Sequence, residues 1–118
     1  MKRPVLHHAS ICVAEVARAR EFYENVLDFV PIPRPEFGFP GVWYGLGAGQ
    51  LHLIQRDGLA RTPHRINPSD PHFAVTVDVP AMRAKLQALG LEVLDAGDQM
   101  WVLDPDGNTV ELRQDGQS

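Results

Sequence analysis

The sequence predicts an α+β fold built from two tandem βαβββ modules. Two observations indicate it. The elements of the first half return in the same order in the second half, and an internal repeat of this kind fixes the architecture. In each half, the first predicted strand also carries a histidine at its start, in "LHHASICV" and "PHFAVTV". The 118 residues, 44% of them hydrophobic, are enough for one compact domain over 1–118, with modules at about 5–57 and 71–114.

The first module begins with a strand predicted over 5–13, where apolar and polar residues alternate. Residues 16–27 predict an amphipathic helix, because apolar side chains recur at helical spacing. The residues of this apolar stripe are Val16, Ala19, Phe22, Tyr23, Val26 and Leu27. Three short strands follow at Phe29–Ile32, Val42–Leu46 and Gln50–Gln55, separated by the Pro- and Gly-rich "PIPRPEFGFPG" and the turn "GAG".

A connector over Arg56–Asp70, without helical or strand periodicity, leads to the second module. A strand is predicted at 72–78 and a helix opened by Pro80 follows, with Gly90 just past its end. Its apolar stripe is Val79, Met82, Leu86 and Leu89. The last strands are predicted at Leu91–Leu94, Met100–Leu103 and Thr109–Arg113, with the turn "DPDG" before the last of them.

Composition narrows the classes of partner. The net charge is −4 and no run of lysines or arginines occurs, which argues against nucleic acid and anionic membranes. No apolar run is long enough to span a bilayer, and the N-terminal segment "MKRPVLHH" lacks the apolar core of a signal peptide. The single cysteine, Cys12, has no partner for an internal disulfide. We therefore expect a cytoplasmic protein with a small-molecule ligand.

Strand parity places four candidate metal ligands on the sheet face that is opposite the apolar side chains. His8, His52, His72 and Glu111 each lie on the face opposite to an apolar row of the same strand. If the helices cover the apolar rows, the four side chains point to the open face of a curved mixed sheet, around a metal-binding cavity. Three imidazoles and a carboxylate are typical ligands of one divalent ion such as Zn, Ni, Fe, Mn or Co.

Other chemically notable residues are interpreted differently. His7 has the opposite parity and His64 falls in the connector, so neither is predicted to be a ligand. Cys12 shares the ligand face but lies four residues from His8, which favours packing. Substrate contacts are predicted for residues that line the pocket or its entrance, where an arginine favours an anionic group. These are Trp43, Trp101, Phe37, Phe39, Arg34 and Arg113.

Four segments resemble the vicinal oxygen chelate superfamily, which includes glyoxalase I, extradiol dioxygenases and the fosfomycin- and bleomycin-resistance proteins. They are "HHASICVAEVARAREFYENVLDF", "GQLHLI", "PHFAVTV" and "LDPDGNTVEL". The resemblance implies that metal ligands fall on the first and last strand of each module, at His8, His52, His72 and Glu111. It also implies that the two halves of one chain, or halves of two chains, close a cavity together. Because sheet edges would otherwise be exposed, we expect a homodimer.

The chemistry implied by this resemblance is metal-dependent. A divalent ion would chelate vicinal oxygens of a small substrate and stabilise an oxyanion or enediolate. Glu111 is the one carboxylate of the set and therefore the candidate catalytic base. A glyoxalase-like lyase or isomerase resembling lactoylglutathione lyase is the preferred function, although His52 stands where glyoxalase I has a carboxylate. The alternatives are an extradiol-type dioxygenase and a non-catalytic binding or resistance protein.

Overall fold

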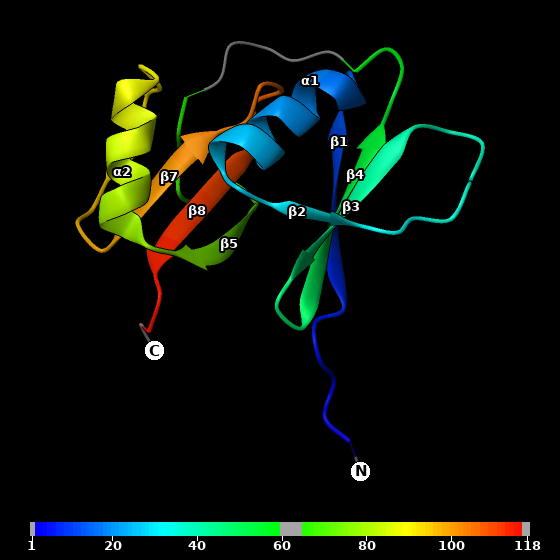
Figure 1. Ribbon diagram of the computed structural model, residues 1–118, viewed down its shortest axis with the longest axis horizontal. Helices are drawn as coiled ribbons and strands as arrows, with labels where there is room; N and C mark the ends of the chain where they lie inside the picture. The colour runs from blue at the N-terminus through cyan, green and yellow to red at the C-terminus, as the bar shows by residue number, and fades with distance from the viewer. Residues whose placement is uncertain (1, 60–64, 117–118) are drawn as a thin grey trace. The chain divides into compact units, whose positions relative to one another are not determined.

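The computed structural model of the protein describes residues 2–59 and 65–116. The chain divides into two compact units, residues 1–59 and 60–118. Each unit has the order β-α-β-β-β and contains one four-stranded mixed sheet (Figure 1). The predicted α+β fold of two βαβββ modules is therefore confirmed.

The sheet of the first unit has the strand order β1-β4-β3-β2. β1 pairs with β4 in parallel, and the other neighbours are antiparallel. Its elements are β1 His8–Val13, α1 Val16–Arg20, the π-helix η1 Glu21–Val26, β2 Val30–Ile32, β3 Gly41–Leu46 and β4 Gly49–Gln55. The predicted strand over 5–13 begins only at His8, and Val5 and Leu6 are exposed.

The second unit repeats this topology with the order β5-β8-β7-β6, and again the first and last strands are parallel. Its elements are β5 His72–Val77, α2 Val79–Ala88, β6 Leu94–Asp95, β7 Gln99–Leu103 and β8 Thr109–Gln114. The Asp78 side chain accepts the Ala81 N–H and caps α2. None of the helices in the described part of the chain is long and apolar enough to cross a membrane.

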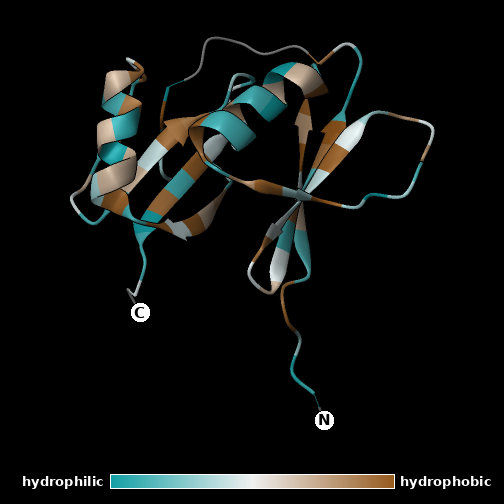
Figure 2. Ribbon diagram, viewed as in Figure 1, coloured by the Kyte–Doolittle hydropathy of each residue, from teal (hydrophilic) through white to brown (hydrophobic). Residues whose placement is uncertain are grey.

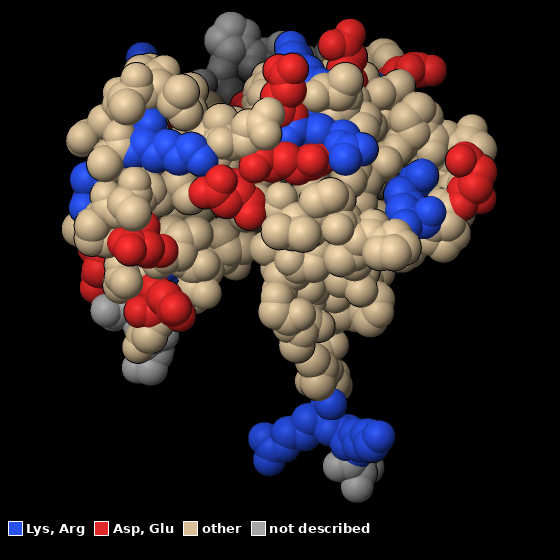
Figure 3. Space-filling model, viewed as in Figure 1, with Lys and Arg blue, Asp and Glu red and all other residues tan. Residues whose placement is uncertain are grey.

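The predicted apolar rows form the core of each unit. Leu51 and Leu53 on β4, and Val110 and Leu112 on β8, are almost wholly buried. Figure 2 shows the corresponding alternation of hydrophobic and hydrophilic residues along the strands. On the face drawn in Figure 3, basic and acidic side chains are interspersed where charged groups occur, a broad area without them lies toward the N-terminal end, and a further basic group lies at that end.

Three local predictions need correction. The helix predicted over 16–27 is α-helical only to Arg20, and its later turns are π-helical, with the Leu27 N–H bonded to the Phe22 carbonyl. The strand predicted at Leu91–Leu94 shrinks to Leu94–Asp95, because the Leu91 N–H closes the end of α2 on the Leu86 carbonyl. Leu89 follows the last residue of α2 and is 54% exposed, so it leaves the apolar stripe.

Candidate functional site

In the first unit, the two predicted histidine ligands lie in contact. His8 on β1 and His52 on β4 have stacked rings, with centroids 4.1 Å apart and an angle of 14° between planes. They are diagonal neighbours on one face, because Ser10 is the residue directly opposite His52. The predicted parity of these two strands is confirmed by this contact.

The surroundings of His52 keep its imidazole neutral. Its Nε2 lies 2.8 Å from Gln50 Oε1, and only 7% of the residue is exposed. Burial lowers the pKa of His52, and the nearby charges of His8, His7 and Arg34 lower it further. A neutral imidazole is the form that coordinates a metal ion.

In the second unit, the other two predicted ligands form a pair of their own. His72 Nε2 lies 3.0 Å from Glu111 Oε1, and the other ring nitrogen, Nδ1, lies 2.7 Å from the Asp70 carbonyl oxygen. Because a carbonyl only accepts, Nδ1 carries a proton. The pKa of His72 is raised, first by this bond to Asp70 and then by the contact with Glu111.

Glu111 is buried and held on both oxygens. Trp101 Nε1 donates to Oε1 at 3.1 Å, and Arg113 Nη1 donates to Oε2 at 2.9 Å. Burial by itself would raise the pKa of Glu111. Hydrogen bonds from Arg113, His72 and Trp101 outweigh that effect, so the pKa lies below its usual range and the group is ionised at neutral pH.

The two pairs occupy equivalent positions of the two sheets. Trp43 lies directly opposite His52 on β3 and β4, and Trp101 lies directly opposite Glu111 on β7 and β8. Both tryptophans therefore face the ligand side, although their contacts differ. The Trp43 ring stacks on His52 with centroids 4.0 Å apart, whereas Trp101 is buried and donates to a carboxylate.

Each pair lies within one unit. Within residues 2–59 and 65–116, no group of three or more His, Cys, Asp or Glu side chains is placed to hold a metal ion. The four-ligand site therefore stays a prediction. His7, predicted not to be a ligand, has its Nδ1 2.9 Å from Nδ1 of His8, and His64 lies outside the described residues.

The remaining predicted contact residues lie in two places. Arg34, Phe37 and Phe39 belong to the segment between β2 and β3, where the guanidinium lies over both phenyl rings. Arg113 on β8 pairs with Glu111 and also donates to Gln99 Oε1 at 3.0 Å. Sequence reasoning missed Gln50 and Gln99. Gln50 could have been found from strand parity, since it lies two residues before His52.

Comparison with known proteins decides the family. The model of the Glyoxalase/Bleomycin resistance protein/Dioxygenase superfamily matches residues 5–112. The chain belongs to this superfamily. The Arabidopsis thaliana protein "Glyoxylase I 4" is a glyoxalase-superfamily relative that is 32% identical over 91% of this chain and 68% of its own length. The resemblance predicted from the sequence is thus confirmed.

Solved structures share the superfamily fold. Lactoylglutathione lyase from Agrobacterium tumefaciens superposes with a TM-score of 0.71 at 20% identity, covering 97% of this chain and 96% of that one. A variant of the fosfomycin resistance protein from Listeria monocytogenes gives a TM-score of 0.72 at 16% identity, covering 97% and 93%. That structure contains Mn(II) and 1S,2S-dihydroxypropylphosphonic acid. A superfamily member of this fold is therefore known with a divalent metal.

Proposed function

We propose that this protein is a divalent-metal-dependent glyoxalase-like enzyme of the lyase or isomerase type. In this proposal, His8, His52, His72 and Glu111 hold one ion. The support is that a His–His pair and a His–Glu pair occupy equivalent positions of the two βαβββ units. Membership of the superfamily and the glyoxalase I relative favour the same activity.

The contact between His72 and Glu111 is the observation that carries the proposal. Nδ1 of His72 donates to the Asp70 carbonyl, and Nε2 lies 3.0 Å from Glu111 Oε1, so a proton can bridge these two atoms when no metal is bound. Two acceptors at this distance repel unless a proton or a metal cation lies between them. The pair can therefore hold either a proton or a divalent ion at the same place, and the ionised Glu111 and neutral His52 are the right protonation states for ligands.

A bound divalent ion would supply Lewis-acid stabilisation of negative charge on vicinal substrate oxygens. The chain's own residues supply the proton transfer. Glu111 would take a substrate proton at Oε1 and return it to the neighbouring carbon, as an isomerisation requires. Trp101 and Arg113 orient this carboxylate from opposite sides and keep it ionised between turnovers.

Metal titration of the purified protein tests the ligand set. We expect one ion per chain, and His52→Ala or His72→Ala should each weaken binding by at least about tenfold because a direct ligand is lost. His64→Ala, in the connector, is the matched control and should bind like the parent protein. Unchanged affinity in both ligand variants would refute the proposed site.

Activity assays separate the lyase from its alternatives. The protein loaded with Ni, Zn, Mn or Co should convert methylglyoxal in the presence of glutathione, and Glu111→Gln should abolish turnover while leaving the fold intact. Ring cleavage of catechols with Fe(II) would instead identify an extradiol-type dioxygenase. Metal binding without turnover of either substrate would favour the non-catalytic binding protein.

One experiment tests both the predicted homodimer and whether the metal-binding residues of a site come from one chain or from two. If each site combines halves of two chains, mixing His8→Ala with Glu111→Ala chains restores about a quarter of the metal sites in random dimers. If each chain builds its own site, mixing restores none. Light scattering that gives a monomer at micromolar concentration would reject the dimer itself.

A further inference from the structure

A continuous row of rings follows the ligand face of the first unit. Starting at His8, the rings follow one another in the order His52, Trp43, Phe37 and Phe39; all the contacts are stacked except that between Trp43 and Phe37, whose planes are tilted by 41°. Successive centroids lie 4.1, 4.0, 6.0 and 5.6 Å apart. The row thus connects the two candidate metal ligands with the segment between β2 and β3, entirely within one unit.

The outer end of this row is exposed to an unusual degree. Phe37 and Phe39 are 49% and 43% exposed, whereas the core aromatics Tyr23 and Tyr44 are fully buried. Two stacked phenyl rings in water leave apolar area that a ligand ring could cover. Stability of the unit does not explain this placement, because neither phenyl ring belongs to its core.

Arg34 adds a positive charge at the same end. Its Cζ atom lies 4.9 Å from the Phe37 ring centre and 5.1 Å from that of Phe39. Within the described residues, its hydrogen-bond partner is the Phe39 carbonyl oxygen, at 3.0 Å from Nη2. By contrast, Arg20, Arg83 and Arg113 each bind a carboxylate.

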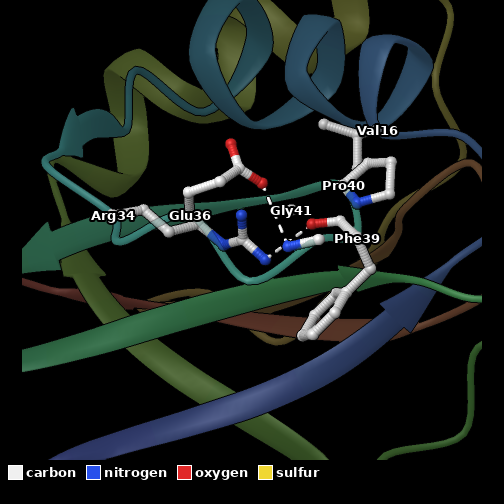
Figure 4. A pocket seen from close by; sticks show the side chains of 7 residues that line it. Val16, Arg34, Glu36, Phe39, Pro40 and Gly41 are labelled. Atoms are coloured by element: carbon white, nitrogen blue, oxygen red, sulfur yellow. Dashed lines mark hydrogen bonds between the residues drawn. The ribbon is translucent and has the colours of Figure 1, made fainter.

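The backbone makes room for this guanidinium. A Cβ atom at Gly41 would lie 2.6 Å from the Leu53 carbonyl oxygen and 2.9 Å from both Nε and Nη2 of Arg34, so glycine is needed against the neighbouring strand and also leaves space for the guanidinium. A cavity of about 460 Å³ adjoins it, bordered by Val16, Glu36 and Phe39 as well (Figure 4). The Glu36 carboxylate accepts the Gly38 N–H at 3.1 Å, and no ion pair between Glu36 and Arg34 occurs among the described residues.

We propose that Arg34, Phe37 and Phe39 form a subsite for an aromatic carboxylate, which makes the substrate an aryl compound with an anionic group. This assignment rests on the proposed function for the identity of the ligand as substrate. The aryl ring packs on the exposed Phe37 and Phe39 rings, and the carboxylate accepts from the guanidinium fork. An aliphatic acid satisfies only the second contact, and a neutral arene only the first.

Calorimetry on the metal-free protein tests the subsite independently of the metal ligands. Benzoate is the probe, with cyclohexanecarboxylate as the non-aromatic acid and benzamide as the uncharged arene. We expect benzoate to bind at least about tenfold more tightly than either, since each lacks one of the two contacts. Equal affinities for benzoate and cyclohexanecarboxylate, or no benzoate binding at millimolar concentration, would overturn the assignment.

Three variants locate the binding. Arg34→Met should weaken benzoate at least about tenfold and leave benzamide unchanged. Phe37→Leu, at an exposed position that tolerates substitution, should remove the preference for benzoate over cyclohexanecarboxylate. Arg3→Met removes the same charge outside the row and should bind benzoate like the parent protein. Parent-like binding in both Arg34→Met and Phe37→Leu would reject the subsite.

This design separates the two proposals. Loss of metal binding in the metal titration, with benzoate binding intact, would count against the enzyme assignment alone. The opposite result, in which one ion binds as expected and benzoate does not, would retain the metal site and reject the aromatic carboxylate.

Discussion

The two βαβββ units share a scaffold and differ on the ligand face. In both, a glutamine at the end of the last strand caps the helix: Val16 N–H donates to Gln55 Oε1 at 2.9 Å, and Val79 N–H donates to Gln114 Oε1 at 3.0 Å. In the first unit, His52 lies in a stack of rings. At the equivalent position of the second unit, Glu111 lies among hydrogen-bond donors.

This difference shows how one repeated fold can serve two chemical tasks. Backbone pairing and the apolar rows determine the positions of the strands. The side chain on the ligand face, His52 in one unit and Glu111 in the other, can therefore differ without a change in the sheet. The first unit places the neutral His52 in a stack of rings, and its metal binding belongs to the proposed function. The second supplies an ionised carboxylate suited to proton transfer.

The hydrogen bonds and ion pairs that connect helix and sheet also differ between the two units. In the first unit, the Tyr44 hydroxyl on β3 donates to Glu24 Oε2 at 2.9 Å, and Arg20, four residues before Glu24 in the helical segment, pairs with the same carboxylate at 2.6 Å. In the second, Arg83 on α2 binds Asp95 of β6 at 2.6 Å. The first connection is half-buried, whereas the second lies on the surface.

The largest expected effect comes from the shared core. Leu53 on β4 and Leu112 on β8 occupy equivalent positions and are fully buried. We expect Leu53→Ala and Leu112→Ala each to lower the free energy of unfolding by about 2–5 kcal/mol, because each removes buried area and leaves a cavity. Chemical denaturation measures both. A cost below about 1 kcal/mol in one variant only would show that the two scaffolds are not equivalent.

The glutamine caps should give a smaller and again matched effect. Gln55→Ala and Gln114→Ala leave the first helical N–H groups without an acceptor, at an expected cost of about 0.5–2 kcal/mol each. Gln87→Ala on the exposed side of α2 is the control and should be nearly neutral. If Gln55→Ala and Gln114→Ala destabilise the protein no more than Gln87→Ala does, the two glutamines do not cap their helices in a way that contributes to stability.

The smallest effect concerns the charged pairs and pH. The bond from Arg83, reinforced by the Gly97 N–H, lowers the pKa of Asp95 to about 2 from 3.8. A depressed carboxyl pKa stabilises the folded state above the unfolded value and loses that contribution as pH falls from about 3.8 through about 2. The exposed pair contributes little to stability, so NMR titration is the sensitive measurement.

In that titration, Arg83→Met should return the pKa of Asp95 toward 3.8 and leave Glu24 unaffected. The pKa of Glu24 is also depressed: burial opposes the shift, and hydrogen bonds from Arg20 and Tyr44 prevail. Tyr44→Phe should therefore raise the Glu24 value alone. If Asp95 of the unmodified protein titrates at its ordinary value, the Arg83–Asp95 ion pair does not form in solution.

The spacing of apolar residues predicted most of the fold, because the side chains buried in the core recur with the period of the strand or helix that carries them. Leu51 and Leu53 flank His52, and Val110 and Leu112 flank Glu111, so strand parity predicted that these side chains lie opposite the apolar rows, with His8 and His72 on the same faces. The same reasoning left the orientation of Trp43 and Trp101 open, since the register of β3 and β7 depends on long-range pairing with their neighbours.

Features set by backbone hydrogen bonds at element ends escaped prediction. Apolar spacing alone does not distinguish an α-helix from the π-helix at Glu21–Val26, and it cannot show that Leu91 completes a helix instead of starting a strand. The partners of the site residues were missed for a related reason. The Asp70 carbonyl belongs to the backbone and carries no sequence signal.

Anomalous diffraction from crystals soaked in a divalent metal tests the central claim most directly. The account predicts one peak per chain, with His8, His52 and His72 nitrogens about 2.0–2.2 Å away and a Glu111 oxygen at a similar distance. It also predicts loss of this peak in the His72→Ala crystal. A peak bound by only one of the two pairs, or none at these residues, would contradict the four-ligand site.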